Sequence, residues 1–357
     1  MEHAGREQSP LDAVLLVGHD YILPRVTGQA AVRACLASVY MMPSAKPVEG
    51  LTLRLAVPLF DTSFTNAERR LVGGRTEVAP GVVVARLTEE ESQRMRRALA
   101  RPESPPQPLW RLEIHMAPLA GRGPTDAQMV SIIRRTMALL SCAVRFAPRW
   151  HMAFLDRHNG EVWVRERHLQ LGAGGSERHS YVPIERVRTW GEILRHWSLL
   201  GLDPVVDLAL DLFYDSVAER QPRPDRAFFA AATAVDVLLG CAASPESERR
   251  IQRAAVLLLA GAKTDELAAT MQSWEHARQE YLRRGISPNP ELLVGLHRFL
   301  MRGLPSMARL MAMVGGYPNA CAGLDVLNNP PDNNHPLMAD DGNRWWDYVD
   351  LDSIVRG

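Results

Sequence analysis

Cysteine is scarce and scattered in this sequence. The 357 residues include four cysteines, Cys35, Cys142, Cys241 and Cys321, and no two of them form a CxxC pair. This spacing argues against a structural zinc site and against a disulfide scaffold. We therefore expect buried, reduced thiols.

An excess of charge of either sign is also absent. Lys+Arg and Asp+Glu both number 41, so the formal net charge is zero. A neutral balance gives no overall attraction to nucleic acid or to an anionic membrane. Any contact with nucleic acid must therefore come from a local basic patch.

Long hydrophobic runs are missing as well. The longest clearly helical apolar run covers residues 254–262, far short of the ~20 residues that cross a bilayer. The first ten residues are polar, and the apolar stretch at 14–17 is too short for the core of a signal peptide. These features predict a soluble, cytoplasmic protein without membrane contact.

The common motifs of metal and nucleotide chemistry do not occur. The Gly-Ala-Gly-Gly stretch at 172–175 lacks a following Lys-Ser or Lys-Thr and the GxGxxG order, so we expect a flexible turn there. The histidines and the aspartate of the 151–179 region have no HExxH or His-x-His spacing. These residues are His151, Asp156, His158, His168 and His179. We predict no metal and no cofactor.

The chain length suggests two domains of ~100–200 residues each, and the first differs in character from the second. Residues 1–195 predict a mixed α/β domain. Apolar and β-branched stretches predict strands at 11–17, 51–60, 82–87, 110–116, 162–164 and 181–184. Helical spacing and N-terminal capping signals predict helices at 30–42, 88–100 and 126–146.

Residues 196–316 predict an all-α, antiparallel helical bundle, which makes the fold class α+β. Helix start signals lie at Asp203-Pro204, Pro224-Asp225, Ser244-Pro245, Thr264 and Asn289-Pro290. Glycines at 240, 261, 285 and 315 mark the helix ends, and the short connections favour antiparallel neighbours. Residues 317–357 carry turn dipeptides and many aspartates, which predict an irregular acidic tail that orders on docking.

The end of the fourth predicted helix carries a specific pattern. Residues 274–285 read WEHARQEYLRRG. This stretch resembles the motif of the HEPN superfamily, Apea-like type, in which a helix carries Arg, about four further residues, His and soon a Gly. Arg278 matches the family arginine and Gly285 the helix end, while Arg283 stands at the histidine position. The helices around Asp236 and Arg253 are similar to the neighbouring family helices.

The resemblance implies a metal-independent endoribonuclease that works as a homodimer, in a bacterial stress response or antiviral defence. In such a protein the arginine holds the scissile RNA phosphate and the histidine transfers protons. Arg278 would keep the catalytic, phosphate-binding role. Arg283 has no lone pair and cannot act as the base.

Several neighbours of Arg278 have two interpretations. Asp236 would orient Arg278 by pairing with it, or would be a solvated polar residue. Tyr281 lies three residues on and shares the helix face of Arg278. His276 points ~160° away around the helix, and His297 lies on the next helix.

The two arginines that end the helix also have two interpretations. Arg283 and Arg284 can simply stabilise the C-terminal end of the helix dipole, by ~0.3–1 kcal/mol. Together with Arg278 they can instead form a phosphate-binding patch that a dimer doubles.

Two functions follow for the chain. The first is an RNA-binding, ribonuclease-like HEPN protein, and the second is a non-catalytic dimerisation or protein-interaction module. A third hypothesis gives the N-terminal half a ligand of its own.

Overall fold

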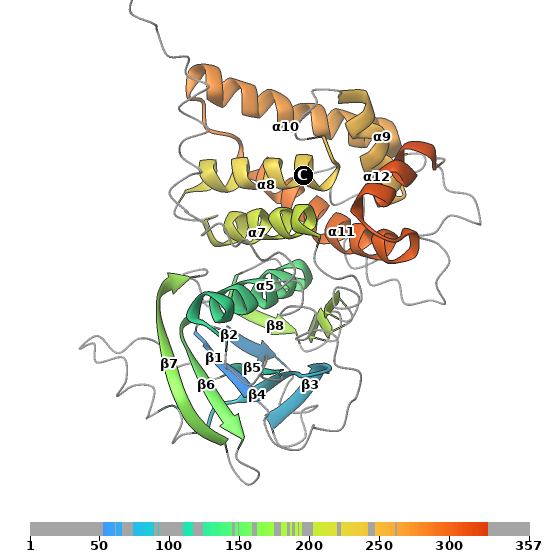
Figure 1. The fold of residues 1–357 in the computed structure, drawn as a ribbon. Helices are drawn as coiled ribbons and strands as arrows, with labels where there is room; N and C mark the ends of the chain where they lie inside the picture. Colours follow the sequence, from blue (N-terminus) through green and yellow to red (C-terminus); the bar gives the residue numbers. More distant parts are fainter. Residues whose placement is uncertain are drawn as a thin grey trace, which may run out of the picture.

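The structure is a computed structural model with a sheet-containing N-terminal half and a helical C-terminal half, so the predicted α+β class is confirmed (Figure 1). It describes residues 53–60, 62–65, 74–88, 92, 110–116, 124–144, 147–148, 150–158, 163–174, 180–183, 186–187, 190–191, 193–194, 203–219, 223–241, 247–260 and 263–327. The elements predicted at 11–17 and 30–42, and nearly all of 88–100, lie outside this part of the chain, as does Cys35.

The main sheet has six strands in the order β3-β4-β5-β1-β6-β7, and each strand is antiparallel to its neighbours. The strands are β1 (Leu53–Leu59), β3 (Arg75–Ala79), β4 (Val82–Arg86), β5 (Trp110–Met116), β6 (Trp150–His158) and β7 (Trp163–Gly174). A separate parallel pair joins β2 (Thr62–Thr65) and β8 (Ser180–Pro183). The sequence predicts β1, β4, β5 and β8 closely and only the start of β7, and it misses β2, β3 and β6.

The glycine-rich stretch at 172–175 corrects one prediction. We expected a flexible turn, but β7 runs through Gly174 and pairs it with Trp150 of β6. The pairing along β7 shifts register twice, and glycine tolerates such irregular strand geometry. The prediction of a turn there is therefore wrong.

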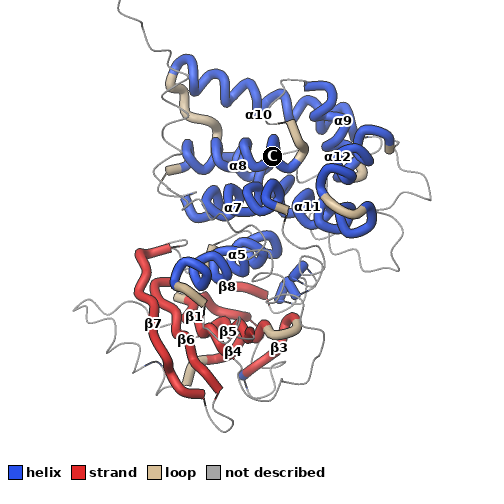
Figure 2. Tube along the Cα trace, in the orientation of Figure 1, coloured by secondary structure: helices blue, strands red, loops and turns tan. Residues whose placement is uncertain are grey.

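Helix α5 (Asp126–Val144) covers one face of the sheet and separates the sheet from the bundle (Figure 2). On β1 the side chains of Leu53, Leu55 and Val57 are fully buried and belong to the same apolar cluster as α5. The intervening positions of β1 and β5 include Arg54 and Glu113, which lie on the opposite face. The period of two along a strand thus gives the sheet an apolar face and a charged face.

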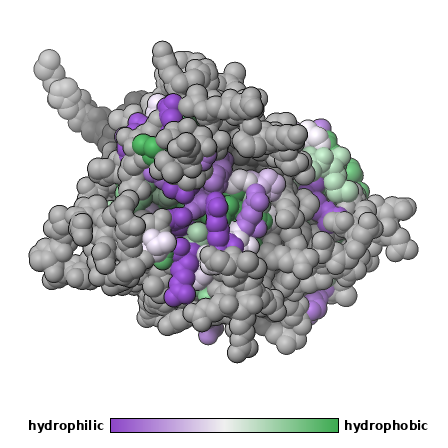
Figure 3. Space-filling view, turned by 90° about the horizontal axis from the view of Figure 1, so that it is seen from below, coloured by the Kyte–Doolittle hydropathy of each residue, from purple (hydrophilic) through white to green (hydrophobic). Residues whose placement is uncertain are grey.

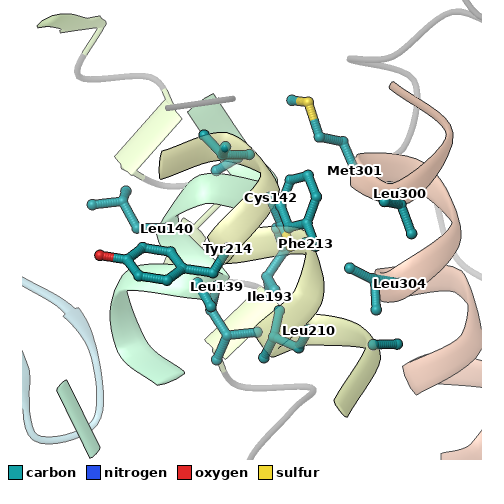
Figure 4. Close-up of a cluster of buried hydrophobic side chains, with 14 of the residues drawn as sticks. Leu139, Leu140, Cys142, Ile193, Leu210, Phe213, Tyr214, Leu300, Met301 and Leu304 are labelled. Atoms are coloured by element: carbon teal, nitrogen blue, oxygen red, sulfur yellow. The ribbon is translucent and has the colours of Figure 1, made fainter. Parts of the chain in front are cut away.

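The other side of α5 packs on the bundle. Arg134 Nη2 of α5 lies 2.7 Å from Asp215 Oδ1 in the first helix of the bundle. Beside it, Trp150 Nε1 of β6 donates a hydrogen bond to Tyr214 Oη of the same helix at 3.1 Å. Side chains of three helices meet in this layer, as Figure 4 shows for Leu139, Leu140, Leu210, Phe213, Tyr214, Leu300 and Leu304. The sheet, α5 and the bundle therefore share one continuous core.

Within the described residues, α5 is also the one helix that is long and apolar enough to cross a membrane. Two thirds of its apolar window, 67%, is buried inside the protein. It lies between the sheet and the bundle, which makes it a core helix.

The bundle follows the predicted start and stop signals that the structure describes, while the predicted start at Ser244-Pro245 and the predicted stop at Gly261 lie outside the described residues. Its helices are α7 (Pro204–Glu219), α8 (Pro224–Leu238), α9 (Ser247–Leu258), α10 (Thr264–Arg284) and α11 (Pro290–Val314). Asn289 Oδ1 accepts a hydrogen bond from the Glu291 backbone N–H at 3.0 Å and caps α11. Gly285 and Gly315 end α10 and α11 with φ values of 68° and 83°, which glycine adopts without strain.

The predicted tail is wrong over its first ten residues, because Tyr317–Val326 form helix α12. Tyr317, Ala320 and Leu324 are buried at helical spacing. The Tyr317 hydroxyl donates to the Val237 carbonyl at 2.6 Å, and Asp325 accepts hydrogen bonds from both Arg249 and Arg253. This segment is therefore part of the bundle. The remaining tail, 328–357, lies beyond the described residues.

The three cysteines in the described part are free thiols. Cys142 and Cys241 are buried and Cys321 is partly buried. Burial raises the pKa of all three thiols, which keeps them protonated. The predicted burial is confirmed for Cys142 and Cys241, while Cys321 is only partly buried.

Candidate phosphate-binding site

Helix α10 is fixed by one apolar stripe. Leu267, Met271 and Trp274 are buried at i, i+4 and i+7, the spacing of a single helix face. The Trp274 ring packs edge-on against Phe299 of α11 at 5.9 Å. Arg278 comes one turn after Trp274 and lies on the same side, at the border between the core and solvent. Its side chain is 33% exposed.

Arg278 and Asp236 form an ion pair, which was one of the two interpretations of Asp236 from the sequence. Arg278 Nη1 donates to Asp236 Oδ2 at 2.9 Å. Asp236 also accepts from Arg250 Nη1 of α9 through Oδ1 at 3.0 Å. Glu275 lies beside both arginines, with its Oε2 3.5 Å from Arg250 Nη1 and 3.9 Å from Arg278 Nη1. We call these four residues the bundle cluster.

The bundle cluster has two positive and two negative residues, so it is balanced in charge. It borders a small pocket between helices, whose other walls are apolar. The pocket is lined by Ala232, Val235, Met271, Trp274 and Leu296 together with the four charged residues. An arginine in such a position is oriented by its carboxylate partners, because charge-assisted hydrogen bonds fix the plane of the guanidinium.

One edge of the Arg278 guanidinium is left for another partner. Both carboxylate contacts of Arg278 use Nη1. Among the described residues, nothing hydrogen-bonds to its Nη2 or Nε. These two donors form a fork that matches two oxygens of a phosphate. The arrangement therefore suits phosphate binding by an arginine that is already oriented.

Tyr281 supports the helix in a different way from the one predicted. Its hydroxyl donates to Asp225 Oδ2 at 2.9 Å, at the start of α8, and its ring lies 5.0 Å from that of Phe229. The hydrogen bond raises the pKa of Tyr281 and lowers that of Asp225. Tyr281 thus fixes the end of α10 against α8, and its hydroxyl is directed to Asp225 instead of Arg278.

The end of α10 lies beside other basic residues. Arg283 and Arg284 are exposed, and Arg284 Nη1 lies 3.1 Å from Glu280 Oε2. Because Tyr281 bonds to Asp225, the exposed Arg223 and Arg226 at the start of α8 belong to the same end of the bundle. We call Arg223, Arg226, Arg283 and Arg284 the basic end.

Neither nearby histidine completes a catalytic pair with Arg278. His297 is fully buried, and its Nε2 lies 2.6 Å from Ser216 Oγ of α7. The Ser216 hydroxyl donates to the Ala227 carbonyl at 2.7 Å, so it accepts from His297. His276 is exposed and two residues before Arg278. In the described part of the chain, no histidine contacts Arg278.

Sequence reasoning missed two groups of residues around Arg278. Glu275 was readable, because it precedes Arg278 by three residues and shares its face. Arg250 and Arg226 come from other helices, and only helix packing brings them close.

The candidate metal ligands of the N-terminal half do not form a group with Arg278. Asp156 binds Arg54 Nη2 at 2.7 Å, and His158 ends β6. The side chains of His151, His168 and His179 lie outside the described residues.

Comparison with known proteins leaves the family open. No family model, no curated protein and no solved structure matches this chain. The resemblance to HEPN proteins stays a prediction from the sequence of the segments that form α8, α9 and α10.

Proposed function

We propose that this chain is a HEPN-like, RNA-binding protein of the bacterial cytoplasm that holds RNA phosphates without cutting RNA. The observation that carries the proposal is the state of Arg278. Asp236 holds its Nη1 at 2.9 Å, while Nη2 and Nε face no described partner. An arginine fixed at one edge loses less entropy when its other edge binds a phosphate.

The basic end extends the surface that RNA would follow. Arg223, Arg226, Arg283 and Arg284 are exposed there, while the acidic neighbours Asp225 and Glu280 are each engaged by another side chain. The start of α8 adds the positive end of a helix dipole. Exposed guanidinium groups together with a helix N-terminus favour a phosphate-bearing chain.

The absence of cutting follows from the missing proton carrier. Arg283 stands where the family resemblance places histidine, and it remains protonated at any working pH. His297 is used inside the core by Ser216. Without a group that exchanges protons near neutral pH, the attack on a phosphodiester lacks its general base.

Binding is tested with a fluorescently labelled single-stranded RNA and anisotropy at several salt concentrations. We expect Arg278→Gln to weaken binding by about fivefold to tenfold, because it removes a charge-assisted contact. The slope of log K against log salt should also become shallower by about one unit for each lost phosphate contact.

Lys263→Gln is the matched control. It removes one positive charge at the N-terminal end of α10, whereas Arg278 lies near the C-terminal end of the same helix. It should change RNA affinity by less than about twofold. If Lys263→Gln weakens binding as much as Arg278→Gln, or if wild type binds no RNA, the proposed site is wrong.

Cutting is tested separately by incubating wild type and Arg283→His with the same RNA and separating the products on a denaturing gel. We expect intact RNA with wild type. Arg283→His restores the proton-transfer group, so it is the variant in which cleavage would emerge. Wild-type cleavage that disappears in Arg278→Ala would refute the non-cutting part of the proposal.

A second candidate function is a homodimeric interaction module. Leu282 and Ile286 are 56% and 53% exposed, on either side of Gly285. Exposed apolar side chains of this size that neighbour each other often mark a surface that another protein chain covers. Light scattering after size exclusion would show a dimer in wild type and a monomer in Leu282→Glu, and a monomeric wild type would reject this candidate.

A further inference from the structure

Two aromatic rings lie at the basic end of the bundle. The ring of Tyr281 on α10 packs against that of Phe229 on α8, with centroids 5.0 Å apart and planes tilted by 59°. Both side chains are partly exposed. Phe229 in turn packs on the apolar core and meets the buried Phe228 edge-on at 6.0 Å. The Tyr281 ring therefore lies at the surface on a support that is itself fixed to the core.

The Tyr281 ring is also fixed through its hydroxyl. The hydroxyl donates to Asp225 Oδ2 at 2.9 Å, and this hydrogen bond is the main reason why the pKa of Tyr281 is raised. The charge of Arg226 acts on that pKa in the opposite direction, which places its guanidinium near the same hydroxyl. A ring held by both a hydrogen bond and a ring contact loses little conformational freedom when a ligand covers it.

Arginines flank this ring along α10. Tyr281 follows Arg278 by three residues and precedes Arg284 by three, so it lies between them on the helix surface, about 4.5 Å from each along the axis. The acidic neighbour Glu280 is engaged by Arg284 at 3.1 Å. Guanidinium groups bind the phosphates of a nucleic acid strand, and an aromatic ring beside them stacks a base. The residues therefore have the order that a single strand needs.

The opposite side of the molecule is charged as well, but it is arranged differently. Figure 3, which views the molecule from the sheet side, shows hydrophilic side chains gathered at the centre of this face. There the buried carboxylate of Glu113 lies 2.6 Å from Arg111 Nη2, and Asp156 lies 2.7 Å from Arg54 Nη2. Phe154 shares this face and is only 3% exposed. Both sides thus carry arginines, while the partly exposed ring of Tyr281 belongs to the basic end.

We propose that the basic end binds a single strand of RNA in which one unpaired base stacks on the ring of Tyr281. This stacking rests on the RNA-binding function proposed above, and it adds the class of RNA that the site selects. The phosphates on the two sides of the base lie against Arg278 and Arg284. A base inside a duplex is covered by its neighbours on both faces, so it cannot reach the ring. Because every base has an aromatic face, the site selects unpaired strands with little preference for sequence.

The test compares two labelled RNAs of equal length by anisotropy with the full chain, a single strand without self-complementarity and the blunt duplex of the same sequence. We expect the single strand to bind about tenfold more tightly, as stacking of one base allows. Tyr281→Leu removes the ring but keeps an apolar side chain, so it should weaken single-strand binding by about tenfold and change duplex binding by less than about twofold. Because no phosphate contact is lost, the slope of log K against log salt should stay as in wild type. Tyr281→Phe keeps the ring and loses one hydrogen bond, so it should stay within about threefold of wild type.

Arg86→Gln is the control for the loss of one positive charge, because Arg86 is exposed at the end of β4 on the sheet. It should leave both affinities within about twofold of wild type. Normal single-strand binding by Tyr281→Leu, with weak binding by Arg278→Gln, would overturn the stacking and leave the RNA-binding function standing. No binding of either RNA to wild type would overturn both. Equal losses in Tyr281→Leu and Tyr281→Phe, equal affinity of wild type for the two RNAs, or a wild-type dimer that Tyr281→Leu makes monomeric would each overturn the stacking alone.

Discussion

On the sheet, Glu113 contacts Arg54, Arg75, Arg111 and His115, and these five residues are called the sheet-face cluster. This cluster and the bundle cluster are built on the same plan but differ in how many arginines share one carboxylate. In each, a carboxylate holds an arginine by a single nitrogen, Glu113 with Arg75 Nη2 and Asp236 with Arg278 Nη1. In the bundle, two acids face two arginines. On the sheet, three arginines surround Glu113.

The difference shows how local charge balance sets what an oriented arginine does. In the bundle cluster each guanidinium has a carboxylate nearby, so attraction for a phosphate is short-ranged and depends on the open edge of Arg278. In the sheet-face cluster the buried carboxylate of Glu113 is shared by arginines of three strands, so its ion pairs hold the strands together. The sheet-face cluster therefore suits a structural role, while the open edge of Arg278 suits a polyanion that makes many contacts.

The largest effect is expected from removing the centre of the sheet-face cluster. Glu113→Ala leaves three arginines without their common acceptor, and breaking a buried ion pair costs about 3–5 kcal/mol. Urea denaturation of the full chain measures this loss of free energy of unfolding. Glu280→Ala is the control, since it removes only a helical i,i+4 pair worth about 0.3–0.5 kcal/mol. Similar losses in both variants would show that Glu113 is not central.

The pH dependence of the free energy of unfolding tests the same contribution of Glu113 to stability. Burial acts to raise the pKa of Glu113, but the hydrogen bond with His115 and the charges of Arg111, Arg54 and Arg75 outweigh it and lower the pKa from 4.5 to about 2. A carboxyl with a depressed pKa in the folded state stabilises above its unfolded pKa and loses this contribution as pH falls. Stability should therefore drop from pH 4.5 toward about 2.

Glu113→Gln should flatten this part of the profile, as followed by thermal unfolding at each pH. Some slope remains, because hydrogen bonds from Arg253 and Arg249 also lower the pKa of Asp325. An unchanged slope in Glu113→Gln would contradict the assignment.

The smallest effect on stability, and the most informative one for the bundle, comes from Asp236→Asn. The change keeps the shape of the side chain and gives the bundle cluster one excess positive charge. We expect a loss of about 1–2 kcal/mol of stability, because both oxygens of Asp236 accept from arginines and the amide nitrogen of asparagine can replace neither of them. RNA affinity should rise severalfold at low salt and return to the wild-type value at high salt. A fall in affinity would mean that orientation of Arg278 by Asp236 matters more than charge balance.

The helical half could be predicted closely because its signals are local. Proline at the first helical position, Asn289 as an N-cap and glycines at the helix ends each act within one helix. The failure at α12 has a physical reason as well. Its helix is short, and ion pairs between Asp325 and the arginines of α9 help to hold it, so the nearby turn dipeptides dominated the local pattern.

The clusters were less accessible to sequence reasoning. The Arg278–Asp236 pair was one of two open interpretations, and the resemblance suggested it. The sheet-face cluster was missed, because Arg54, Arg75 and Arg111 lie far apart in sequence and meet only through strand pairing. Since β3 was not predicted, nothing in the sequence placed Arg75 on the sheet.

The position of α5 has a consequence for how this molecule comes apart. Because one apolar core runs from the sheet through α5 into α7 and α11, cutting the chain between its halves would expose buried leucines and aromatic rings on both fragments. Heating the whole chain should therefore give a single cooperative transition, and neither fragment should stay monomeric by itself. In this protein the boundary between the two halves marks a change of architecture, while the unit that folds includes both.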